Sequence, residues 1–222
     1  MIASPGRVVT VLVGGVAPLG PKAVPSGYVK HAVDGPVAAT ETGLAGDQQA
    51  DRRVHGAPDK AIYGYSLAAY DIWRATVPRH AGRFVPGSMG ENLTLDGLDE
   101  TSVAIGDRVR MGTALLQITE PRQPCYKLAL AFDDPAMPRA LIRSGKCGWY
   151  YRTLEAGVIA AGDMAITLDR PNPQWSVARF FEAVTARAFG RDTLAEIAAL
   201  EGIGDRWRLK ALRALAWQRD GG

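Results

Sequence analysis

Short apolar runs closed by turn residues repeat along the first 175 or so positions of the chain. Four of them, RVVTVLVGG, SVAIGDRVRMG, ALLQITEP and GVIAAGDMAITL, have strand length and are rich in β-branched residues. Such runs, bounded by glycine and proline, are typical of strands. We therefore expect an all-β barrel or sandwich, in which residues 105–118 form a hairpin around Met111 and Gly112.

Two segments of this region have apolar residues at helical spacing instead. Residues 65–77, YSLAAYDIWRATV, predict a helix with Ser66 as its N-cap. Residues 133–145, DDPAMPRALIRSG, predict a short helix that begins near a proline and ends at Gly145.

The pattern changes after the proline-rich joint DRPNPQ. Three amphipathic segments follow, with breaks at Gly190 and Gly202 and with Asp192 as a predicted N-cap: SVARFFEAVTARAFG, DTLAEIAALEG and GDRWRLKALRALAWQRDGG. We predict a β domain over residues 1–175 and a C-terminal three-helix subdomain over residues 176–222.

Composition narrows the class of protein. The chain has 222 residues, of which 47% are apolar and 22% charged, and its net charge is +3. This charge is too small and too dispersed to predict nucleic-acid binding, although it suits an anionic small molecule.

No run reaches the roughly 18 apolar residues of a membrane helix, and the first apolar run, broken by Gly14 and Gly15, indicates a strand rather than a secretion signal. Two cysteines form no disulfide framework, so we expect a cytoplasmic protein.

Cys125 lies in an unusual setting, the segment TEPRQPCYKLAL. Pro121 and Pro124 restrict the backbone, which predicts a stiff bend at the cysteine. Arg122 and Lys127 lie close in sequence, and nearby positive charge favours the thiolate form of a cysteine. A nucleophile or a soft-metal ligand fits this setting, and so does a small buried residue at the end of a strand.

The second cysteine, the histidines and the absence of several known motifs argue against other kinds of catalytic or metal site. Cys147 stands in an apolar context 22 positions after Cys125, so we expect it to be buried and inert, and no CxxC pair exists. None of His31, His55 and His80 has the spacing of a zinc site. The sequence also lacks the glycine-rich dinucleotide motif, the P-loop and the GxSxG esterase motif.

Four segments in order resemble the MOSC domain, named after the C-terminal domain of molybdenum-cofactor sulfurases, and in particular its stand-alone bacterial members of the YiiM type. They are GLAGDQQADRRVHGAPDKAIYGY, GSMGENLTLDGL, VAIGDRVRMGTALLQITEPRQPCYKL and GWYYRTLEAGVIAAGDMAITLDRPNPQWSV. The resemblance covers about residues 20–178, and the three helices that follow match the small domain of those proteins. It implies a mainly β fold, a MOSC-type β-barrel with a few helices.

The resemblance also implies chemistry. Members of this family with an established activity use molybdenum-molybdopterin, the molybdenum cofactor, to reduce N-hydroxylated compounds such as N-hydroxylated bases and amidoximes. The cysteine of their PRxPCYKL motif, here Cys125, is the catalytic protein ligand of molybdenum. Residues implied to contact the cofactor are Ser26, Lys30, His55, Lys60, Glu91, Asn92, Arg122 and Lys127. Residues implied to line a substrate pocket are Asp47, Gln49, Trp149 and Tyr150, although the two aromatic residues also suit a core.

The expected reaction is reduction of N–OH to N–H plus water on a small-molecule substrate. Because the sequence has no flavin, haem or iron–sulfur motif, an external reductase would supply the electrons. Two alternatives use the same thiol: a persulfide carrier and a non-catalytic protein that binds the molybdenum–pterin cofactor. We expect neither a nucleic-acid nor a membrane partner, and a homodimer is compatible with the sequence.

Overall fold

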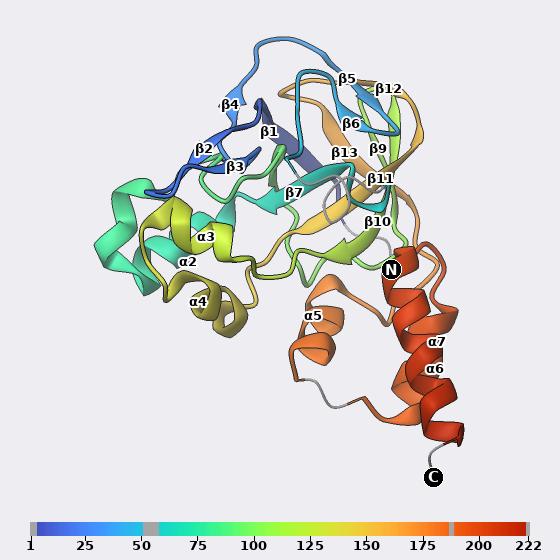
Figure 1. The fold of residues 1–222 in the computed structure, drawn as a ribbon. Coiled ribbons are helices and arrows are strands. Elements are labelled where there is room, and N and C mark those ends of the chain that lie inside the picture. The colour runs from blue at the N-terminus through green and yellow to red at the C-terminus, as the bar shows by residue number, and fades with distance from the viewer. Residues whose placement is uncertain (1–3, 51–57, 187–188, 221–222) are drawn as a thin grey trace.

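The core of the molecule is a closed barrel of seven strands (Figure 1), seen here in a computed structural model that describes residues 4–50, 58–186 and 189–220. Around the barrel the strands run β13–β9–β10–β11–β7–β8–β1, and pairing of β1 with β13 closes it. All neighbours are antiparallel except β7 and β8. The strands are β1 (Gly6–Val13), β7 (Ile62–Ser66), β8 (Leu93–Asp96), β9 (Arg108–Met111), β10 (Ala114–Pro121), β11 (Trp149–Glu155) and β13 (Met164–Asp169). This confirms the prediction of a mainly β barrel with a few helices.

Short strands extend the barrel near its rim. β4 (His31–Ala32) pairs with β1. A hairpin is formed by β2 (Ala17–Leu19) and β3 (Val24–Ser26), and a small sheet by β12 (Gly157–Ile159), β5 (Val37–Thr40) and β6 (Gly43–Leu44).

The predicted hairpin over residues 105–118 is present as β9 and β10. Met111 pairs with Ala114, so Gly112 and Thr113 form the turn, one position later than expected. Gly112 has φ +54°, a value that favours glycine. Nearly every residue of β10 is buried, because the barrel interior lies on one side and the C-terminal helix α5 (Val177–Ala186) packs on the strand.

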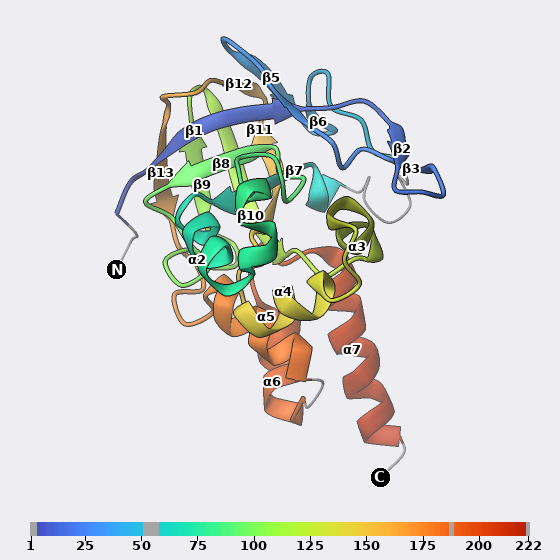
Figure 2. The ribbon, with the colours of Figure 1, turned by 90° about the vertical axis from the view of Figure 1, so that its left-hand side faces the viewer.

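A helical layer covers one side of the barrel (Figure 2). It contains α2 (Ala68–Thr76), the 3₁₀ helix η2 (Pro78–Arg83), α3 (Tyr126–Phe132) and α4 (Met137–Ser144). Leu67, not Ser66, is the N-cap of α2, because Ser66 is the buried last residue of β7. α4 ends as predicted at Gly145 in the left-handed conformation. α3, which begins directly after Cys125, was not predicted.

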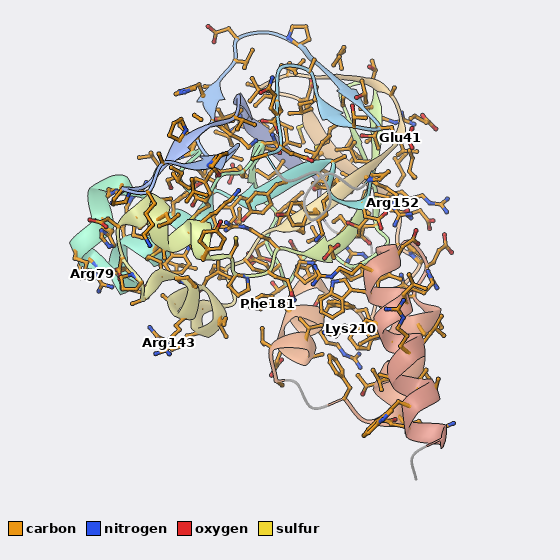
Figure 3. All side chains as sticks on the ribbon, in the orientation of Figure 1. Glu41, Arg79, Arg143, Arg152, Phe181 and Lys210 are labelled. Carbon is orange, nitrogen blue, oxygen red and sulfur yellow. The ribbon has the colours of Figure 1, made fainter. Side chains whose placement is uncertain are left out.

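The three predicted C-terminal helices are present as α5, α6 (Arg191–Ala199) and α7 (Asp205–Asp220). Gly190 rather than Asp192 is the N-cap of α6. Buried side chains of these helices, such as Phe180 and Phe181, join the same apolar core as the barrel. Figure 3 shows Phe181 among these inner side chains, whereas Arg79 and Arg143 project from the surface. The division of the chain into domains at residue 176 stays a prediction.

Within the described ranges, no helix combines the length and the apolar content that crossing a membrane requires.

Candidate functional site

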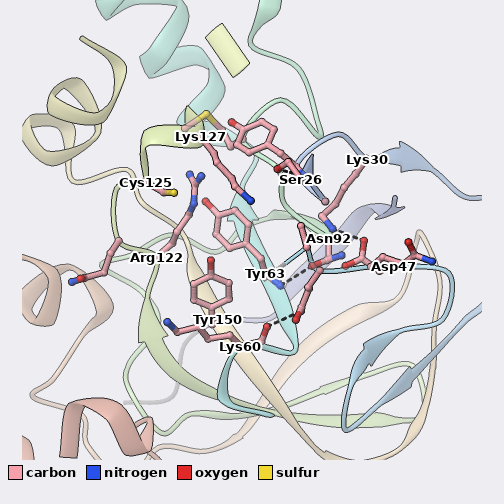
Figure 4. Close-up of a pocket in the computed structure, with 18 residues that line it drawn as sticks. Ser26, Lys30, Asp47, Lys60, Tyr63, Asn92, Arg122, Cys125, Lys127 and Tyr150 are labelled. Carbon is pink, nitrogen blue, oxygen red and sulfur yellow. Dashed lines mark hydrogen bonds and ion pairs between the residues drawn. The ribbon is translucent and has the colours of Figure 1, made fainter. Parts of the chain in front are cut away.

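A pocket opens where loops from the rim of the barrel meet the start of α3 (Figure 4). Its walls contain most of the residues that the sequence singled out: Ser26, Lys30, Asp47, Gln49, Lys60, Asn92, Arg122, Cys125, Lys127 and Tyr150. Tyr28, Tyr63, Met89 and Gln123 also line it. The fold therefore brings together segments that lie more than 100 positions apart in the chain.

Cys125 directly precedes α3 and is the N-cap residue of this helix. Its backbone is extended, with φ −126° and ψ 146°, and its side chain caps no backbone N–H. The thiol is free and half-buried, and in Figure 4 its sulfur points toward the guanidinium of Arg122. Lys127, in the first turn of the same helix, donates from Nζ to the carbonyl of Pro25 at 3.1 Å. The thiol thus faces a basic pocket.

Arg122 is a buried cation among tyrosine rings. Its guanidinium lies 5.2 Å from the centroid of the Tyr63 ring and 5.8 Å from that of Tyr28. Nη1 is buried and has no hydrogen-bond partner among the described residues. Since buried donors in proteins are nearly always satisfied, this nitrogen is positioned for an acceptor on a ligand.

The tyrosines of the pocket are neutral near physiological pH. Burial raises the pKa of Tyr150 to about 12, although the charge of Arg122 opposes the shift. Burial likewise raises the pKa of Tyr28 and of Tyr63. Their hydroxyls therefore remain protonated and are poor proton donors. Those of Tyr28 and Tyr63 already donate to the carbonyls of Ser88 and Cys147 at 2.9 and 2.8 Å, and that of Tyr150 can orient a ligand.

Lys30 and Asp47 form an ion pair in the pocket wall, with side chains only 6% and 4% exposed. Asp47 Oδ1 also accepts the N–H of Gly14 at 3.0 Å. Burial lowers the pKa of Lys30, and the carboxylate of Asp47 opposes that shift. The charge of Lys30 is therefore already compensated, which makes it a weaker anion ligand than Arg122.

A side-chain hydrogen bond and a close backbone contact fix the loop beside the Lys30–Asp47 ion pair. Gln49 Nε2 donates to the carbonyl of Lys60 at 3.3 Å. A Cβ on Gly27 would lie only 2.0 Å from the carbonyl oxygen of Gln48, so only glycine fits at this contact.

Lys60 is 8% exposed and lies 3.7 Å from Oε1 of the buried Glu120. Its Nζ is 5.8 Å from the centroid of the Tyr150 ring. Glu120 was not singled out from the sequence, although a carboxylate inside the apolar run ALLQITEP is a usable signal. Tyr28, in the loop after β3, and Tyr63, in β7, were missed because tyrosines in apolar runs resemble ordinary core residues.

Three of the singled-out residues make most of their contacts within the protein. Glu91 is fully buried and accepts hydrogen bonds from Tyr70, Thr94 and the N–H of Gly87. Asn92 lines the pocket, but its amide bonds the backbone of Tyr63 and Leu12 at 3.0 and 3.2 Å.

Trp149 has no exposed surface, packs in the barrel core and is not among the residues that line the pocket. His55 lies outside the described residues.

The basic side chains and the thiol of the pocket fit an anionic ligand that carries a bound metal. Arg122, Lys60 and Lys127 supply positive charge, and Cys125 supplies one soft ligand. Among the described residues, no group of three or more His, Cys, Asp or Glu side chains could hold a metal ion.

Comparison with known proteins is consistent with this geometry. The family model of the MOSC domain matches residues 51–165. Protein YiiM of Escherichia coli is 43% identical over 141 residues, which are 64% of this chain and 63% of that protein. A protein named Reductase from Gibberella moniliformis is 36% identical over 178 residues, which are 80% of this chain and 32% of that protein. The match thus spans less than two thirds of either relative.

Solved structures match over nearly the whole chain. The crystal structure of YiiM from Geobacillus stearothermophilus has a TM-score of 0.79 at 31% identity and covers 95% of this chain and 99% of that one. YiiM from Escherichia coli has a TM-score of 0.78 at 28% identity, with coverages of 96% and 94%.

Proposed function

The chain belongs to the MOSC domain family, and we propose that it is a molybdenum-cofactor-dependent oxidoreductase that reduces N-hydroxylated compounds. The substrates would be N-hydroxylated bases and amidoximes. The reaction consumes two electrons and two protons, breaks the N–O bond, and yields the amine or amidine and one water. The observation that carries this proposal is the half-buried thiol of Cys125 facing the guanidinium of Arg122, whose buried Nη1 has no hydrogen-bond partner among the described residues.

The residues present fit the cofactor. Cys125 would bind the metal, while Arg122, Lys60 and Lys127 would bind the phosphate and polar atoms of the pterin. When bound, the cofactor supplies the two-electron redox chemistry. A relative named Reductase supports an oxidoreductase of this kind.

The protein's own side chains would bind and orient the substrate. Arg122 keeps a permanent positive charge beside the thiol of Cys125. The hydroxyl of Tyr150 stays protonated and can donate a hydrogen bond to a substrate heteroatom, whereas that of Tyr63 already donates to the carbonyl of Cys147 at 2.8 Å.

The partners belong to the same proposal. The electrons would come from an external reductase, and the protein would act in the cytoplasm on a small molecule. A homodimer is compatible with this activity.

A persulfide carrier needs the same thiol, and a non-catalytic cofactor-binding protein needs the same pocket, so cofactor analysis is the deciding experiment. Protein purified from cells that make molybdenum cofactor should contain about one equivalent each of molybdenum and pterin. It should then reduce an amidoxime when supplied with a reduced electron donor. Folded protein that is active without metal would refute the proposal, and a loaded but inactive protein would indicate a carrier.

A further inference from the structure

β13, at one edge of the barrel in Figure 2, turns its large apolar side chains outward. Met164, Ile166 and Leu168 alternate along the strand and are 47%, 42% and 51% exposed. The intervening Ala165 and Thr167 are buried. A strand with one buried face usually places its larger apolar residues on that face. In β13 this arrangement is reversed, so Met164, Ile166 and Leu168 form an apolar stripe on the outside of the barrel.

The apolar stripe extends across the neighbouring strands. Ile166 lies opposite Arg110 of β9, and Arg110 lies opposite the half-buried Leu115 of β10. Directly opposite residues share one face of a sheet, so these three side chains form a row on the outer face. Nη1 of Arg110 donates to Oε2 of Glu155 on β11 at 2.8 Å. The aliphatic stem of an arginine covers apolar surface while its head stays polar, so Arg110 bridges the two apolar residues.

The charges that border the apolar stripe are balanced. Each bordering arginine lies near a carboxylate of the same chain, at 3.8, 2.6 and 2.8 Å respectively: Arg7 and Asp96, Arg108 and Glu201, and Arg110 and Glu155. A strongly charged partner of either sign therefore meets no matching excess of charge here. A neutral apolar surface fits, and a second copy of this chain presents one with the same balanced border.

The outer side of α7 differs in this respect. It also exposes apolar side chains, but these stand among exposed cations: Leu209, Leu212 and Trp217 beside Arg206, Lys210 and Arg213. Two copies of this face would bring like charges together, which opposes self-association. Of these two exposed apolar faces, only that of β13 is compatible with a second copy.

We propose that the outer face of β13 is a dimerisation surface, on which a second copy of this chain packs its own apolar stripe. A twofold contact uses the same surface on both copies and is the commonest symmetry of soluble oligomers. Ile166, in the middle of the apolar stripe, lies at the centre of this contact. Burial of the outward apolar side chains supplies the free energy of association. The inference goes beyond the proposed function, because it concerns assembly and requires neither cofactor nor substrate.

The test measures the association of the full-length protein by sedimentation equilibrium at about 1–200 μM, a range that suits interfaces of moderate affinity. The unaltered protein should be dimeric at the upper end. Ile166→Asp puts one carboxylate from each copy into the apolar contact, so the dimer Kd should rise about hundredfold or more. About 0.5 M sodium chloride should change the Kd of the unaltered protein less than about threefold, because screening has little effect on an apolar contact.

Leu212→Asp is the matched control. Leu212 is 49% exposed, close to the 42% of Ile166, but it lies on α7. The same substitution there should leave the Kd unchanged.

Four results would overturn the inference: a monomeric unaltered protein at the highest concentration, a dimer that survives Ile166→Asp, dissociation through Leu212→Asp, or dissociation by salt. Circular dichroism checks that each variant folds. If Ile166→Asp does not fold, Met164→Lys at the exposed start of β13 decides in its place and should likewise dissociate the dimer. Since no metal or turnover enters these measurements, their outcome is independent of whether the reductase proposal holds.

Discussion

Replacing each cysteine by serine in turn distinguishes a residue needed for catalysis from a residue needed for the stability of the fold. In Cys125→Ser, a hard hydroxyl that stays protonated replaces the soft thiol, so reduction of N-hydroxylated substrates should be abolished. The fold should not suffer. Cys125 is the uncapped N-cap of α3, and serine is a preferred N-cap residue that stabilises helices by up to about 1 kcal/mol.

Cys147→Ser should show the opposite result. Cys147 has no exposed surface, and burial raises the pKa of its thiol, so it is inert in the core. A serine hydroxyl buried there without a partner costs about 2 kcal/mol. For a chain of this length, that corresponds to a Tm lower by about 4–8 °C. Activity at 25 °C should remain near that of the unaltered protein.

The assay pairs amidoxime reduction with thermal unfolding for each variant. Cys125→Ser should have a Tm equal to or up to about 4 °C above that of the unaltered protein, and no activity. Some pterin can still bind through Lys60 and Arg122, so the molybdenum-to-pterin ratio is measured as well and should fall. Full activity in Cys125→Ser, or equal loss of activity in both folded variants, would refute the assignment of the working sulfur.

Two further predictions concern charges. Arg122→Lys keeps the positive charge but loses the planar fork of donors, so cofactor retention should fall about tenfold, whereas Arg139→Lys on the surface should change nothing; equal retention in both would contradict the role of Arg122. Hydrogen bonds from the N–H of Ala136 and from Arg79 and His80 lower the pKa of Asp134 from 3.8 to about 2. The stability that this carboxylate adds is therefore present above about pH 3.8 and lost as the pH falls toward 2. Urea unfolding at pH 2–5 should show a shallower pH dependence for Asp134→Asn, and parallel curves would refute it.

Local sequence patterns determined much of the secondary structure of this protein. β-branched runs between glycines and prolines predict strands wherever they occur, and the end of α4 at Gly145 follows from the ease with which glycine adopts a left-handed conformation. The contrast between Cys125 and Cys147 was also readable, because the prolines and charges around the first differ from the apolar context of the second.

The alternation of side chains along β11 shows the limit of what a local sequence pattern determines. Trp149 and Tyr150 are neighbours in β11, so their side chains point to opposite faces of the strand. The sequence therefore indicates that one of them enters the core and the other does not. Only the closed barrel decides that Trp149 fills the core while Tyr150 lines the pocket.

Tertiary contacts alone decided how the polar residues are used. Closure of the barrel by β1 and β13 joins segments nearly 160 positions apart, which no local pattern encodes. Asn92 became a brace because its amide meets two distant backbone groups. Glu120 lies beside the site because Lys60 and Trp207, which are far apart in the sequence, both contact it. A side chain's chemistry is set by its sequence, but its partners are set by the distances that folding creates.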